Sequence, residues 1–153
     1  MLETKKVGKF NLAASIVLMV TGLLMFFGEW LSFALYQNTA PEGSATIGLG
    51  FAVVIIYGLI FGCVVLAMGI LNLVCSIMQM KKEGLKAAKV MTIISPIAHL
   101  VSVGCLIFWA VLMFSLYMSG IILKVIYIGA IALALVAAIR CFCALGKAKK
   151  TNE

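Results

Sequence analysis

Long stretches without any charged residue dominate this sequence and limit what it can fold into. Two of them run over 10–28 and 43–80, and a third runs over 90–123. A helix that crosses a bilayer needs about 20 mostly apolar residues, so each stretch is long enough to span one. Ser119-Gly120 is the one plausible break in the third stretch, and it adds a fourth span. We therefore predict an all-α integral membrane protein, a four-helix transmembrane bundle with short loops, formed by residues 1–153 as a single domain. The predicted helices cover about 10–30, 47–80, 89–117 and 121–145.

The composition supports a membrane protein over a soluble one. Hydrophobic residues make up 65% of the chain and charged residues 11%. Soluble domains have about 45–50% apolar and about 25% charged residues, so this chain could not cover itself with a polar surface. The net charge of +7 comes from short Lys and Arg clusters between apolar stretches, which is typical of membrane-protein loops. We therefore expect the chain to interact with a lipid bilayer and not with nucleic acid.

The distribution of basic residues predicts the orientation of the bundle. Eleven of the twelve Lys and Arg lie in the N-terminal segment, in the middle loop over 81–89 or at the C-terminal end, and only Lys124 lies on the other side. The positive-inside rule then places both termini and the middle loop in the cytoplasm. We expect the plasma (cytoplasmic) membrane. Lys5, Lys6 and Lys9 before the first apolar stretch resemble a signal peptide, but that stretch exceeds the usual 7–15 residues, so we interpret it as a retained helix.

A few polar residues fall deep inside the predicted spans and need partners there. A polar group in hydrocarbon without a hydrogen bond costs several kcal/mol. Asn72 and His99 lie at nearly equal distances from the middle loop, so they should be level in an antiparallel hairpin, with Ser95 one turn from His99. Two interpretations remain open. His99 could titrate, bind a ligand or line a path, or the pair could simply hold two helices together.

Small residues form a stripe along the second predicted helix. Gly58, Gly62 and Gly69 fall on the same face as Asn72. Gly58 and Gly62 make a G-x-x-x-G pattern, which permits close approach of another backbone. We predict that this face packs against the third helix, with Asn72 near His99. Association with a second chain is the alternative.

Two further features lie near the predicted membrane boundaries. Glu29 and Lys124 are the charges expected nearest the outer boundary, so we expect them to pair. Cys141 and Cys143 lie at the cytoplasmic boundary, where palmitoylation is possible, although inert thiols are the default. The remaining cysteines also lie in apolar stretches, so no disulfide framework is indicated.

The sequence leaves the function open between classes. The short loops, small-residue faces and lack of buried acids favour a structural or accessory subunit, acting by helix packing in a homo-oligomer or with other membrane protein subunits. A small channel or transporter formed by an oligomer, with a polar path near Asn72 and His99, is the alternative, although such paths usually contain carboxylates. A membrane enzyme is less expected, because a single His without a nearby carboxylate makes no acid–base set. No catalytic residue, metal site or cofactor is predicted, and no motif identifies a family.

Overall fold

The computed structural model describes residues 2–37, 45–81, 86–116 and 121–150, and each of these segments is one α-helix. Helix α1 covers Leu2–Gln37, α2 Ala45–Lys81, α3 Lys86–Leu116 and α4 Ile121–Lys150. The side chains nearest several helix ends lie outside this description. The order and number of helices agree with the prediction, and α2 begins two residues from the expected start at 47. Both α1 and α4 extend beyond their predicted ends.

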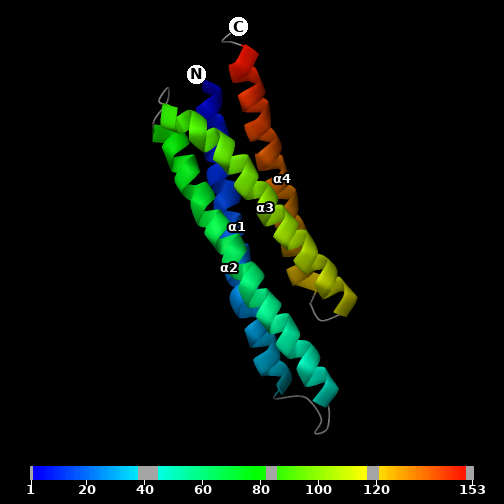
Figure 1. Ribbon diagram of the computed structural model, residues 1–153. Helices are drawn as coiled ribbons and strands as arrows, with labels where there is room; N and C mark the ends of the chain where they lie inside the picture. The colour runs from blue at the N-terminus through cyan, green and yellow to red at the C-terminus, as the bar shows by residue number, and fades with distance from the viewer. Residues whose placement is uncertain (1, 38–44, 82–85, 117–120, 151–153) are drawn as a thin grey trace.

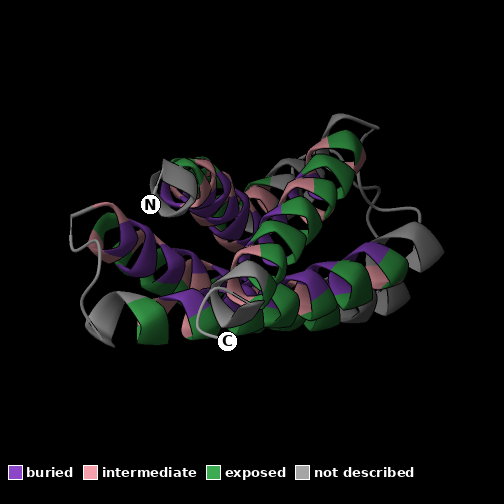
Figure 2. Ribbon diagram, turned by 90° about the horizontal axis from the view of Figure 1, so that it is seen from above, coloured by how far each residue is buried: buried purple, intermediate pink, exposed green. Residues whose placement is uncertain are grey.

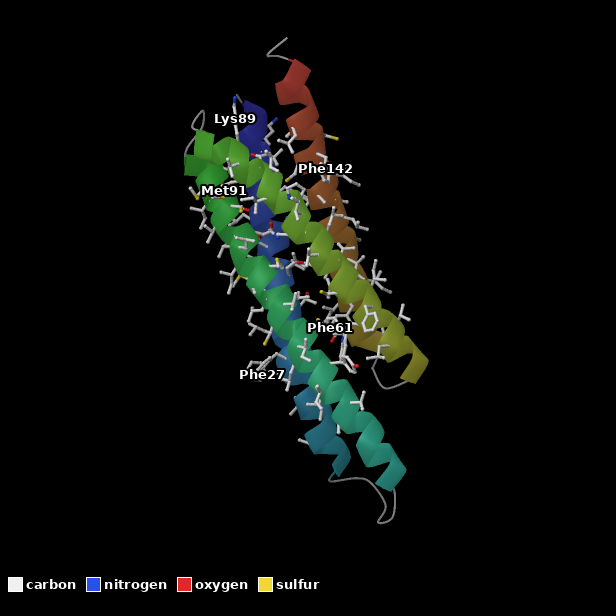
Figure 3. All side chains as sticks on the ribbon, in the orientation of Figure 1. Phe27, Phe61, Lys89, Met91 and Phe142 are labelled. Atoms are coloured by element: carbon white, nitrogen blue, oxygen red, sulfur yellow. The ribbon has the colours of Figure 1, made fainter. Side chains whose placement is uncertain are left out.

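Each helix contains a segment long and apolar enough to cross a membrane. These segments are Lys6–Gly28, Ile55–Met80, Lys89–Leu112 and Lys124–Gly146. Figure 2 shows the buried residues on the inner faces of the helices and the exposed residues on their outer faces. The exposed residues include many large apolar side chains. Phe27 on α1 and Phe142 on α4 are examples that point away from the bundle in Figure 3. An apolar outer surface of this kind suits a surrounding of lipid rather than water.

The four helices form a closed ring of neighbours. Each helix packs against the one that follows it, and α4 also packs against α1. The pair α1 and α2 makes the most extensive contact, and these two long helices extend past α3 and α4 at one end (Figure 1). At the opposite end, α1 begins, α2 ends, α3 begins and α4 ends, so both termini lie together there (Figure 1). We call this end the terminal end of the bundle.

The interior has two parts along the bundle axis. The part farther from the terminal end is an apolar core to which all four helices contribute Leu18, Met25, Val65, Val103, Leu106, Trp109, Tyr127, Ala130 and Ala134. Phe61 joins α2 to α3 in this part, with its ring centroid 5.2 Å from that of Phe108 and 6.5 Å from that of Trp109. On α4 the core residues are mainly alanines, which let that helix approach closely. The part nearer the terminal end is polar.

Candidate functional site: a buried polar layer

Seven side chains from all four helices form a buried polar layer near the terminal end. None of them is more than 8% exposed. The layer consists of Asn11 on α1, Asn72 and Gln79 on α2, Thr92, Ser95 and His99 on α3, and Cys141 on α4. Hydrogen-bonding groups in an apolar interior are costly unless they bond one another, so their convergence is the distinguishing feature of this chain.

Asn11 is the centre of the layer because its amide nitrogen reaches the three other helices. Nδ2 lies 3.3 Å from Gln79 Oε1 on α2, 3.4 Å from Ser95 Oγ on α3 and 3.0 Å from Cys141 Sγ on α4. The nitrogen carries only two hydrogens, so these three acceptors share two donors. One side chain thus connects all four helices.

A second set of contacts joins α2 to α3 through Asn72. Its Oδ1 accepts a hydrogen bond of 3.0 Å from Ser95 Oγ, and its Nδ2 lies 3.4 Å from His99 Nδ1. The proximity of Asn72 and His99 agrees with the equal depth read from the sequence. Because an amide nitrogen only donates, His99 Nδ1 is the acceptor, and the proton of the neutral ring lies on Nε2.

The hydrogen bonds form a continuous chain across the bundle. Asn11 donates to the Ser95 hydroxyl, that hydroxyl donates to Asn72, and the Asn72 amide donates to His99. On the side of the layer nearer the terminal end, Gln79 Nε2 donates to Thr92 Oγ1 over 3.4 Å, a second link between α2 and α3. Such networks fix the relative positions of helices more sharply than apolar packing does.

Other buried hydroxyls do not take part in this network. Ser15, Thr21, Ser76 and Ser102 each donate to the carbonyl four residues earlier in their own helix, over 2.6–2.9 Å. These bonds satisfy the hydroxyl locally and join no helices. These four residues are therefore buried without connecting one helix to another, unlike the members of the polar layer.

Two polar atoms of the layer have no hydrogen-bond partner among the described residues. They are Asn11 Oδ1 and His99 Nε2. In the apolar part of the core, Trp109 Nε1 is also without a partner in the described part of the chain. The described residues thus leave one acceptor and one N–H donor of the polar layer without a hydrogen bond.

The glycine face of α2 packs against a different helix from the one predicted. A Cβ added at Gly62 would lie 3.1 Å from Gly22 O and from Phe26 N, both on α1, and one at Gly69 would lie 3.1 Å from Met19 N. The prediction that this face meets the third helix is therefore wrong for Gly62 and Gly69. Gly58 is also buried. The glycines serve the long α1–α2 contact, while α2 meets α3 through Phe61 and through its polar residues.

The two candidate lipidation sites differ in accessibility. Cys141 is 0% exposed and its thiol contacts Asn11 and Ser95, so an acyl chain there would require the layer to open. This burial disfavours Cys141 as a lipidation site and agrees with the inert thiol expected by default. Cys143 is exposed, as lipidation requires. The side chain of Glu29 lies outside the described residues, and with it the expected pair with Lys124.

Two members of the layer, Asn11 and Gln79, were missed in the sequence. Both lie two residues from a lysine, Asn11 after Lys9 and Gln79 before Lys81, so neither stands out in the sequence as a deeply placed polar residue. Their positions on the buried apolar faces of their helices could have identified them. Asn11 lies on the same helical face as Leu18, seven residues on, which is buried.

The donor types of the layer limit its chemistry. Across the described residues, no group of three or more His, Cys, Asp or Glu side chains gathers closely enough to hold a metal ion. The layer can donate, accept and position hydrogen bonds. No family model, curated protein or solved structure was found to match this chain.

Proposed function

We propose that this chain crosses the plasma (cytoplasmic) membrane four times, with both termini on the cytoplasmic side. The four apolar segments and the apolar outer surface support insertion. The clustering of basic residues supports the orientation, since the helix ends that flank the basic segments lie together at the terminal end (Figure 1).

Within that membrane, the chain acts as a structural or accessory subunit, either in a homo-oligomer or with other membrane proteins. The observation that carries this proposal is the polar layer, whose hydrogen-bonding groups are used mainly to connect the four helices of one chain. A layer used in this way makes a defined four-helix unit. Other proteins would then contact this unit through its outer, apolar surface.

Two outward-facing glycines offer places for another helix to approach. Gly104 on α3 and Gly129 on α4 are exposed, and a Cβ at either position would meet nothing within 4 Å. Between membrane helices, small residues permit the close backbone contact that favours association. These positions are therefore the first ones to change in a test of assembly.

The mass of the particle in a bilayer tests the subunit role. We expect the purified chain, in lipid nanodiscs and in mild detergent, to run as a multiple of its 16.4 kDa mass or with a stoichiometric partner. Gly129→Leu should weaken the assembly, while Ile128→Leu at the neighbouring exposed position should not. A single chain at every concentration, without any stoichiometric partner, would contradict the proposal.

A channel or small transporter is the second candidate. Asn11 Oδ1 and His99 Nε2, which have no partner among the described residues, favour it, because a polar solute or water passing through the layer needs hydrogen-bonding groups that are not already used. This candidate predicts solute flux in proteoliposomes that His99→Asn abolishes without loss of folding. Liposomes that contain folded protein and show no flux would leave the subunit role as the better account.

A further inference from the structure

Arg140 is the only arginine of the chain and lies on the flank of α4 that faces α1. Its side chain is exposed, and its guanidinium carbon lies 4.2 Å from the centroid of the Phe10 ring on α1. A guanidinium over an aromatic face is held by the negative charge of the ring surface, and the contact is stronger where water is scarce. Phe10 therefore fixes the position of the Arg140 charge at the edge between α1 and α4.

The position of Arg140 along α4 places this charge near the surface of the hydrocarbon. Arg140 follows Lys124 by sixteen residues, a rise of about 24 Å, which is less than the hydrocarbon thickness of about 30 Å. If both charges reach outward in opposite directions, Arg140 lies at the level of the lipid phosphates on the side of the terminal end.

Among the described side chains, no carboxylate lies beside Arg140. The four apolar segments contain no Asp or Glu, and among the described side chains Arg140 makes no ion pair. The nearest acidic residue along α1 is Glu3, seven residues and about 10 Å from Phe10. Another base is closer, since Lys6 is exposed one turn before Phe10 on the same side of α1. Among the described side chains, this edge thus has two positive charges and an aromatic ring, and no anion.

We propose that Arg140 and Lys6 bind the phosphate of an anionic membrane phospholipid at the α1–α4 edge, with Phe10 holding the guanidinium in place. A guanidinium presents paired N–H donors that match two phosphate oxygens, whereas lysine supplies a point charge. The acyl chains would lie on the apolar outer surfaces of the same two helices. This inference rests on the membrane insertion proposed above but not on the subunit role.

Lipid retention measured by native mass spectrometry tests the site. The wild-type protein is reconstituted in nanodiscs of phosphatidylcholine with phosphatidylglycerol, and is then released into detergent for counting of bound lipid. We expect preferential retention of phosphatidylglycerol, weakened about tenfold by Arg140→Gln, the change expected from losing a charged hydrogen-bonding partner. Arg140→Lys, which keeps the charge but not the paired donors, and Phe10→Leu should each give an intermediate loss.

Lys89→Gln is the matched control, because Lys89 is an exposed base at the same end of the bundle on α3 (Figure 3). Equal losses for Lys89→Gln and Arg140→Gln would show general charge attraction and overturn the site. So would equal retention of both lipids by the wild type. If inorganic phosphate displaces the retained phosphatidylglycerol and binds Arg140 without lipid, the ligand is free phosphate and the lipid assignment is wrong.

Insertion is measured separately, by resistance of the proteoliposomes to carbonate extraction. A chain that is extracted would overturn the membrane proposal and the lipid site together. A chain that stays inserted and shows no lipid preference would overturn only the lipid site. Circular dichroism of each variant verifies that the helices are retained, and Phe10→Leu tests the site without removing a charge if Arg140→Gln does not fold.

Discussion

At the scale of single residues, the bundle depends on a few amides placed among apolar side chains. Asn11 contacts the other three helices, and both the oxygen and the nitrogen of the Asn72 amide form hydrogen bonds with α3. Lipid tails are as apolar as leucine, so hydrophobic burial does little to hold membrane helices together. Close packing and such polar contacts then decide which helices meet and in what register.

Replacement of Asn11 by alanine should destabilise the bundle more than removal of a hydroxyl one turn away. Asn11→Ala removes the donor shared by Gln79, Ser95 and Cys141, and we expect a loss of about 1–2 kcal/mol. Ser15→Ala, equally buried, removes only a bond to the carbonyl of Asn11 in its own helix and should cost about 0.5 kcal/mol or less. Unfolding with sodium dodecyl sulfate in mixed micelles gives both values. Equal losses would mean that Asn11 contributes by its volume and not by its bonds.

The contact between Asn72 and His99 should appear as a coupling energy. A double-mutant cycle with Asn72→Ala and His99→Ala should give about 0.5–1 kcal/mol, the usual range for polar contacts between membrane helices. The control cycle pairs Asn72→Ala with Ser102→Ala, because Ser102 is buried on the same helix as His99 but bonds only Ala98. A coupling no larger than that of the control would reject the hydrogen bond.

At the scale of the helices, the sequence predicted the elements well and their contacts less well. The long charge-free stretches predict four helices because only a helix satisfies its own backbone in an apolar surrounding. The glycine stripe of α2 identified a face for close packing. It could not identify the partner, because in a ring of four each helix has two neighbours and a small-residue face does not say which of them it meets. Gly22 on α1 supplies the complementary surface.

Substitution of Gly22 should test the α1–α2 contact most directly. A Cβ at Gly22 would lie 2.8 Å from the backbone nitrogen of Leu66, so the two helices must move apart. We expect Gly22→Ala to destabilise the bundle by about 1–3 kcal/mol, as overpacking usually does. At Gly8 the nearest atom is Cγ of the flexible Met80 side chain, 2.9 Å away, so Gly8→Ala should cost less.

The matched control for Gly22 is Gly104→Ala, because a Cβ at Gly104 would meet nothing within 4 Å. Its effect should be neutral or slightly favourable, since alanine is the better helix former. Micellar unfolding ranks the three variants. A Gly104→Ala loss as large as that of Gly22→Ala would show that the effect comes from the helix itself and not from its neighbour.

At the scale of the whole molecule, charge and polarity are distributed unevenly along one axis. The polar layer and the exposed bases Lys6, Lys9, Lys89 and Arg140 lie toward the terminal end, and the apolar core lies toward the other. The layer was harder to predict than the core. Its members come from four separate helices, and only the tertiary arrangement brings residues 11, 79, 95 and 141 together.

This asymmetry leads to a prediction about which side of the membrane each end faces. Eleven of the twelve Lys and Arg lie in the segments at the terminal end, and moving such charges across a bilayer is costly during insertion. Both termini and residues 81–89 should therefore be cytoplasmic, and residues 38–44 should face outward.

Single cysteines placed by Ser44→Cys and Gly84→Cys, in a chain whose five native cysteines are replaced, can be labelled in intact cells with an impermeant maleimide. We expect label at position 44 only, and at both positions after the cells are opened. Label at 84 and not at 44 in intact cells would invert the orientation, and label at both would mean that the chain does not cross the membrane as a four-span bundle.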